Sequence, residues 1–257
     1  MPALIHPRTC LAALAVMILI AAPVPGRAGT ALAAVAANFA ETAEALVPAF
    51  RAETGHDIRL TTGSTGKLYA QIRAGAPFDL LLSADSDTPA RLLAEGHAVE
   101  GSSFTYAVGR LALWSADPDR IDGDGRAALD DPDLRFLAIA NPDLAPYGVA
   151  AREALRALGI WDTFQPRIVM GQNVGQTHSM VATGAAELGF VALSAVISPR
   201  AGSTGSRWDV PQDLFAPIRQ DAVLLSPDNA AARAFLEFLR SEHAAEVIDR
   251  FGYGTAD

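Results

Sequence analysis

Residues 57–74 read DIRLTTGSTGKLYAQIRA, and this stretch decides the fold. It starts as a strand-like run over 57–61, turns in the small polar residues 62–66 and continues as a helix-like run over 65–74. The same order of apolar run, small polar turn and helix recurs around 34–38, 141–148 and 171–175. Such turns present free backbone N–H groups at helix N-termini, where anions bind. Four copies therefore predict a pocket for a small oxyanion.

Strand and helix patterns alternate on both sides of this stretch. The predicted strands lie at 30–37, 57–61, 78–83, 105–115, 136–140, 167–170, 188–196 and 222–226. The predicted helices lie at 39–50, 65–74, 87–94, 149–158, 175–185, 229–240 and 244–251, with loops at 116–133 and 198–212. This alternation is typical of an α/β protein with mostly parallel sheets flanked by helices.

Two runs, near 104–109 and 217–222, are long enough to cross between two lobes. We therefore expect a second lobe, 107–220, inserted into a first lobe made of 29–106 plus 221–257. Ligands of open α/β sheets bind outside the carboxyl ends of the strands, so each lobe would contribute two of the four turns. A cleft that closes by hinge bending around the ligand follows from this arrangement.

The N-terminus has the pattern of a secretory signal peptide. Arg8 precedes an apolar run over 11–22, and turn formers and small residues follow as far as Ala28. The run is too short to span a membrane, and Cys10 precedes it, which argues against a lipoprotein anchor. We expect residues 1–28 to be removed and the mature chain, without any cysteine, to be periplasmic.

The charge balance excludes nucleic acid and anionic membranes as partners. Removal of 1–28 takes away two arginines, which leaves 18 basic residues against 29 acidic ones, a formal net charge of about −11. No basic stripe is present to bind a polyanion. A bound anion must therefore be held by local dipoles and hydrogen-bond donors.

Six segments of the chain form a distinctive ordered set: AANF (36–39), GSTGKLYAQI (63–72), AGAP (74–77), LSAD (82–85), NP and APYG within 141–148, and LGFVAL (188–193). In this order they resemble the periplasmic molybdate-binding proteins of ABC importers. The likeness covers about 31–253. It implies a type II two-lobed binding-protein fold without a cofactor, capture of molybdate or tungstate, and delivery to an ABC permease and its ATPase. We expect the protein to be a monomer.

By position, the resemblance assigns six residues to the oxyanion site. The first loop contributes Ala37 and Asn38, with Asn38 as an amide donor, and the second contributes Ser64 and Thr65. Tyr147 and Val174 contribute backbone donors from the third and fourth loops. Asn38, Thr65, Tyr147 and Val174 would touch the molybdate oxygens without being direct metal ligands. Ala192 stands where one branch of the family has a tyrosine, so the number of side-chain donors stays open.

The residue types suit a fully ionised tetrahedral oxyanion, which needs several donors and no acceptor. Phosphate would need an acceptor for its own proton, and Asp85 or Asp143 could supply one, so sulfate and phosphate remain alternative ligands. Asn38, Ser64 and Thr65 are also good helix N-caps, and Tyr147 is also a good core residue.

Enzyme hypotheses find little support, although a two-lobed enzyme or a sensor on the same fold stays open. Gly66-Lys67 is followed by Leu68, so no nucleotide-binding phosphate loop is present. A hydrolase would need Ser64 or Thr65 with His178 as its base, and no orienting acid stands at a recognisable spacing.

Overall fold

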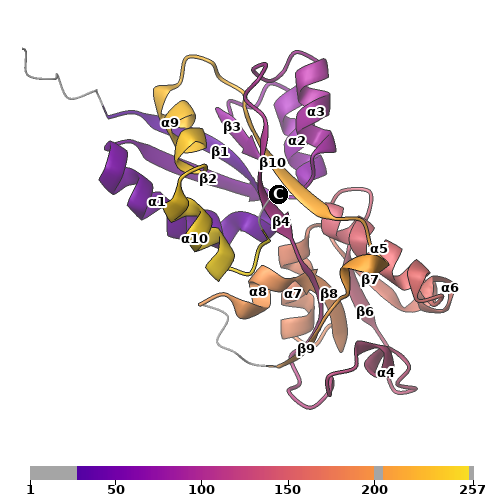
Figure 1. The fold of residues 1–257 in the computed structure, drawn as a ribbon. Coiled ribbons are helices and arrows are strands. Elements are labelled where there is room, and N and C mark those ends of the chain that lie inside the picture. Colours follow the sequence, from indigo (N-terminus) through magenta and orange to yellow (C-terminus); the bar gives the residue numbers. More distant parts are fainter. Residues whose placement is uncertain (1–27, 200–204, 255–257) are drawn as a thin grey trace, which may run out of the picture.

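The computed structural model describes residues 28–199 and 205–254, which form two lobes, each built on one five-stranded sheet (Figure 1). The predicted α/β fold class with two lobes is confirmed. The predicted signal peptide, 1–28, lies outside the described residues except for Ala28. None of the helices in the described ranges is both long and apolar enough to cross a membrane.

The first sheet has the strand order β2-β1-β3-β10-β4. Its strands are β1 (Thr30–Ala36), β2 (Asp57–Gly63), β3 (Leu80–Leu82), β4 (Phe104–Gly109) and β10 (Ile218–Leu224). Strands β1, β2 and β3 run parallel, and β10 runs antiparallel to both of its neighbours. Only β10 returns from the far lobe, which explains its opposite direction.

Helices cover both faces of this sheet because successive residues of β1 point to opposite sides. Ala33 and Val35 pack with α1 (Ala40–Thr54), α9 (Ala230–Phe238) and α10 (Glu242–Arg250). Ala34 packs on the other face with α2 (Thr65–Arg73) and α3 (Asp87–Ala94). Helix α1 continues through Pro48 and ends at Gly55, whose φ of 72° is the left-handed conformation typical of a helix end.

The second sheet has the strand order β7-β6-β8-β5-β9. Its strands are β5 (Leu111–Ser115), β6 (Leu137–Ala140), β7 (Ile168–Gly171), β8 (Leu188–Ala192) and β9 (Ser206–Asp209). Its helices are α4 (Gly125–Leu129), α5 (Pro146–Ala157), α6 (Trp161–Phe164), α7 (Val174–Ala182) and α8 (Leu193–Ile197). Leu113 and Ile139 pack against α5, and Trp114 and Ala138 pack on the opposite face with α7 and α8.

The predicted long strand 105–115 is two strands in different sheets. Strand β4 ends at Gly109, the chain passes through Arg110, and β5 begins at Leu111. The chain returns from the second sheet to the first between β9 and β10. The predicted lobe limits, after 106 and after 220, therefore fall inside β4 and β10, because a strand pattern does not show where a chain leaves one sheet for another.

Two other predictions need correction. The run 188–196 was expected to be one strand, but β8 ends at Ala192 and α8 follows, with the Leu193 N–H donating to the Arg110 carbonyl at 2.9 Å. An unbroken apolar run has no periodicity that separates strand from helix, which explains the error. The expected loop 198–212 contains β9, which pairs with β5 at the sheet edge.

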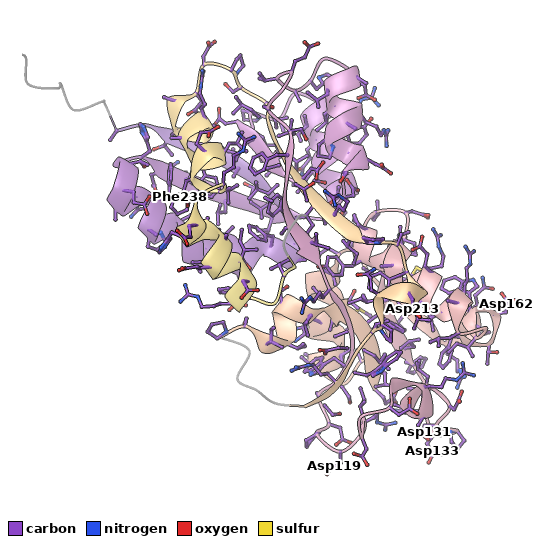
Figure 2. All side chains as sticks on the ribbon, viewed as in Figure 1. Asp119, Asp131, Asp133, Asp162, Asp213 and Phe238 are labelled. Atoms are coloured by element: carbon purple, nitrogen blue, oxygen red, sulfur yellow. The ribbon has the colours of Figure 1, made fainter. Side chains whose placement is uncertain are left out.

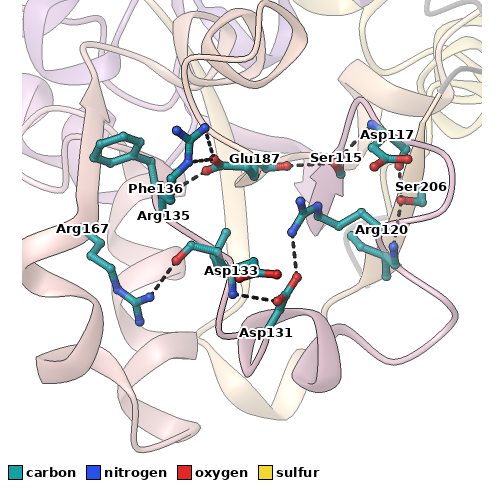
Figure 3. A network of polar contacts seen from close by, with 12 residues as sticks. Ser115, Asp117, Arg120, Asp131, Asp133, Arg135, Phe136, Arg167, Glu187 and Ser206 are labelled. Carbon is teal, nitrogen blue, oxygen red and sulfur yellow. Dashed lines mark hydrogen bonds and ion pairs between the residues drawn. The ribbon is translucent and has the colours of Figure 1, made fainter.

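The excursion 116–133 is fastened to the second sheet by polar contacts (Figure 3). Ser206 on β9 donates to the Asp117 carbonyl at 2.6 Å and accepts from the Ile121 N–H at 3.0 Å, while Arg120 pairs with Asp131 inside the excursion at 2.9 Å. Beside it, Ser115 donates to the Glu187 carbonyl at 2.8 Å. Figure 2 shows Asp119, Asp131 and Asp133 at the end of the second lobe remote from the first. This acidic end lies away from the junction between the lobes, where the four predicted loops meet.

Candidate functional site

The four loops predicted from sequence surround one narrow cavity between the lobes. We call 34–38, 62–66, 141–148 and 171–175 the first to fourth loop. All six predicted site residues line the cavity, whose lining comprises Ala36, Ala37, Asn38, Gly63, Ser64, Thr65, Ala84, Ala145, Pro146, Tyr147, Asn173 and Val174. The cavity is narrow, with a volume of about 10 Å³ in this closed structure. Only a compact solute suits this cavity.

The second loop supplies hydroxyl groups. Ser64 is 2 % exposed, and its Oγ is buried without a hydrogen-bond partner in the protein. It holds the N-cap position of α2 in an extended conformation, yet its side chain makes no capping bond. Thr65 Oγ1 accepts a hydrogen bond from the Ala84 N–H at 3.1 Å, which leaves its own proton to donate. Two hydroxyl donors therefore remain for a solute.

The first loop differs from its prediction in the role of the Asn38 side chain. Asn38 Nδ2 donates to Gln220 Oε1 at 2.9 Å and to the Tyr253 hydroxyl at 3.3 Å, so both amide hydrogens have protein acceptors. The Asn38 carbonyl accepts from the Tyr253 and Ser194 hydroxyls. What this loop offers the cavity is backbone, because residues 37–39 form a 3-10 turn whose first N–H groups have no partner within the turn.

The third and fourth loops also offer backbone groups. Tyr147 is the second residue of α5, and its hydroxyl accepts from Gln220 Nε2 at 3.3 Å, so its side chain is committed to the junction between the lobes. Val174 is the first residue of α7, where Asn173 caps the helix by accepting from the Gln176 N–H at 2.8 Å. N–H groups in these first positions have no acceptor within their own helices.

Direct contacts between the lobes close over the cavity. The Gly66 N–H donates to the Leu144 carbonyl at 3.0 Å, which joins the second loop to the third. A Cβ atom at position 66 would lie 3.1 Å from that oxygen, so the close approach favours glycine. Lys67 Nζ donates to Gln172 in the fourth loop. The structure is therefore a closed form, in which the two lobes contact each other directly across the cavity.

The electrostatics of the cavity favour a fully ionised anion. None of its lining residues, all within the described part of the chain, carries a charge, and no carboxylate is available there as an acceptor. Helices α2, α5 and α7 begin at its wall, so the positive ends of their dipoles point toward it. Within 28–199 and 205–254, no group of three or more His, Cys, Asp or Glu side chains could hold a metal cation.

The residues of the hydrolase hypothesis are not brought together. His178 does not line the cavity, and its ring stacks on Trp114 with a centroid separation of 4.5 Å. Burial lowers the pKa of His178, although Glu41 opposes that shift. Asp85 and Asp143, considered as acceptors for phosphate, instead line a larger groove of about 470 Å³ between α3 and α5.

Sequence inspection missed a buried polar cluster beside the cavity, made by Gln220, Tyr106, Tyr253 and Ser194. Gln220 and Tyr253 are fully or almost fully buried, and burial raises the pKa of Tyr253 to about 12, so its hydroxyl keeps its proton. Burial also raises the pKa of Tyr106. A lone glutamine in a strand-like run gives no sequence signal, because only the tertiary fold shows whether it is buried.

Comparisons with known proteins place this chain in a family of binding proteins. A family described as "Bacterial extracellular solute-binding protein" matches residues 31–254. The molybdate-binding protein ModA of Rhodobacter capsulatus is 48% identical over 233 residues, 90% of each chain. ModA of Azotobacter vinelandii is 48% identical over 223 residues, 86% of this chain and 88% of its own. The solved periplasmic molybdate-binding protein of Azotobacter vinelandii superposes with a TM-score of 0.84 at 41% identity, covering 88% of this chain and 100% of its own.

Proposed function

Because this chain belongs to the family of bacterial extracellular solute-binding proteins, we propose that its interlobe cavity captures molybdate, and also tungstate, for ABC-type import. The chain is a binding protein and not an enzyme, and its partners are the oxyanion, a membrane permease and the ATPase of that permease. We propose that it acts in the periplasm, like the solved periplasmic molybdate-binding protein of Azotobacter vinelandii. We further propose that residues 1–28 are removed on export and that the mature chain is a monomer.

The buried hydroxyl of Ser64 is the observation that carries this proposal. A hydroxyl without a partner in a closed cavity is costly unless a ligand completes its hydrogen bonding. Beside it stand the proton of Thr65 and the backbone N–H groups that begin α2 and α7. A set of donors without a carboxylate acceptor matches a tetrahedral oxyanion that carries no proton.

The same donor set disfavours phosphate. Singly protonated phosphate would bring a hydrogen into a cavity whose lining contains no carboxylate. Sulfate carries no proton and differs from molybdate mainly in size. Size is therefore the property by which this cavity would separate the two.

A thermal-shift panel on the chain without residues 1–28 tests the proposal, with molybdate, tungstate, sulfate and phosphate as ligands. At about 1,000 times its dissociation constant, a ligand stabilises the folded state by roughly 4 kcal/mol, which is an easily measured shift. We expect this shift with molybdate and tungstate, followed by titration calorimetry for the affinities. A thermal shift only with sulfate or phosphate would contradict molybdate as the ligand. No shift with any of the four anions would contradict the proposed role as an oxyanion-binding protein. Molybdate uptake in a deletion strain then separates transport from sensing, because a sensor's loss would leave uptake intact.

A further inference from the structure

Gln220 is a fully buried amide at the junction of the two lobes. It lies on β10, one of the two strands near the crossings, and the β4–β10 ladder shifts register between Gln220 and Asp221. A bulge of this kind re-aims a side chain out of the regular alternation of a strand. Gln220 does not line the anion cavity, so whatever it does there it does through other residues.

The Gln220 amide connects both halves of the cavity. Its Oε1 accepts from Asn38 Nδ2 in the first loop at 2.9 Å, and its Nε2 donates to the Tyr147 hydroxyl in the third loop at 3.3 Å. The Tyr106 hydroxyl on β4 lies 3.1 Å from the same Oε1 and 2.9 Å from the Ser83 carbonyl. One side chain thus joins the first lobe, the second lobe and the neighbouring crossing strand.

The backbone of β4 packs closely against this amide at Gly109. A Cβ atom at Gly109 would lie 2.3 Å from the Tyr147 hydroxyl and 2.6 Å from Gln220 Nε2. The end of β4 therefore packs directly on the pair, at the point where the chain leaves the first sheet. Any rotation of one lobe on the other about these strands changes the distance between Gln220 and Tyr147.

We propose that Gln220 is a positioning residue that couples closure of the lobes to the alignment of the first and third loops around the anion. The inference rests on the proposed function. In the closed form the amide fixes the position of Asn38 relative to Tyr147, so the backbone N–H groups of these two residues converge on one solute. Without the amide, the two loops are no longer fixed relative to each other when the lobes meet.

The variant Gln220→Glu tests the coupling, because it keeps the shape of the side chain and changes its donors. A carboxylate cannot donate, so any bond to Tyr147 would have to reverse its direction with the Tyr147 hydroxyl as donor, and its charge opposes an anion held nearby. We expect the dissociation constant for molybdate to rise at least about tenfold near pH 8 and to recover by about pH 5.5, where a buried carboxyl regains its proton and can donate. Gln220→Met keeps the volume without hydrogen bonds and should bind weakly at both pH values.

Other titratable and charged groups lie around position 220, and the comparison between pH 8 and pH 5.5 must be controlled for them. Tyr106, Tyr147 and Tyr253 face it, and burial raises the pKa of each, so all three stay neutral across this range. Asp221 and Arg219 adjoin it in the chain, and Asp85 lies close enough to Tyr106 to influence its pKa. Wild-type protein titrated at both pH values corrects for these groups and for protonation of the anion.

Calorimetry with small-angle scattering, with and without molybdate, gives the decisive result. Weak binding by Gln220→Met with a diminished ligand-induced compaction supports the coupling, because this variant removes the hydrogen bonds without adding a charge. Recovery of Gln220→Glu at low pH supports it only together with that result. Failure of the wild type to bind would overturn the proposed function. Wild-type binding with variant affinities within about twofold of it would overturn the inference alone. If neither variant folds by circular dichroism, Tyr147→Phe, which removes only the partner hydroxyl, must weaken binding, and wild-type affinity there would overturn the inference.

Discussion

The two lobes supply the anion cavity with different kinds of donor. The first lobe offers the hydroxyls of Ser64 and Thr65, one of them without any protein partner. At its predicted contacts the second lobe offers backbone N–H groups, because Val174 is apolar and the Tyr147 hydroxyl lies against Gln220 and Gly109 at the junction between the lobes. Side-chain substitutions can therefore remove donors from the first lobe's half. Only a change in the backbone can remove those of the second lobe's half.

The largest expected effect comes from deleting a backbone donor in the second lobe with Val174→Pro. Val174 is the first residue of α7, where proline is tolerated, and Asn173 before it is extended, with φ −154° and ψ 170°, as proline requires. Loss of an N–H bonded to a charged ligand should weaken molybdate binding by roughly 2–3 kcal/mol, measured by titration calorimetry.

The matched control is Val174→Ala, which trims the same side chain and keeps the N–H. It should bind within about threefold of the wild type, since every donor remains. If the proline and alanine variants bind equally well, the backbone of the fourth loop is not part of the site. The contrast between hydroxyl donors from the first lobe and backbone donors from the second lobe would then no longer hold.

A second pair of variants separates the two hydroxyls of the first lobe. Thr65→Val should weaken binding by roughly 1–3 kcal/mol and also lower the free energy of unfolding of the free protein, because the buried Ala84 N–H loses its acceptor. Ser64→Ala should weaken binding comparably and leave the stability of the free protein unchanged or higher, since it removes an unpaired buried hydroxyl. Calorimetry and urea denaturation without ligand measure both quantities. Unchanged affinity in Thr65→Val would remove that hydroxyl from the site, and lost stability in Ser64→Ala would contradict its lack of a partner.

The smallest effect is a pH dependence in the second lobe. Burial lowers the pKa of His178 from its ordinary 6.5, so the folded state binds a proton less readily than the unfolded state. Stability is therefore fully present above about pH 6.5 and declines slightly as the pH falls through the folded pKa, because His178 is only partly buried and solvent screens its charge. Urea denaturation of the free protein, repeated above pH 6.5 and at successively lower pH values, should show this decline in the free energy of unfolding. His178→Gln should flatten it, and His97→Gln, an exposed position in the first lobe, should not.

Much of the fold follows from local patterns that need no tertiary information. The helix over Asp87–Ala94 was predicted with its observed limits, and the end of α1 at Gly55 follows from a glycine in the left-handed conformation. The errors lie where local patterns are ambiguous. The apolar run after Leu188 suits a strand or a helix, and the strand-like run before Ser115 gives no sign that it changes sheet at Arg110.

The candidate site divides in the same way. The sequence by itself determined that four turns at strand ends carry small polar residues ahead of helices, since free N–H groups at a helix start are a local property. That property predicted a pocket for an oxyanion, and the resemblance to the molybdate-binding proteins then assigned Ser64, Thr65 and Val174 to it. It could not determine which donors stay free, because each donor is satisfied or left open by residues remote in the chain.

Only the tertiary structure decided that the Asn38 amide is spent on Gln220 and Tyr253, which lie 182 and 215 residues away, while Ser64 keeps its hydroxyl unpaired. It also decided that Gly66 meets Leu144 across the cleft. The physical reason is that a hydrogen bond depends on distance and direction in space, and contacts between the lobes exist only after both sheets have formed and the crossing strands have joined them.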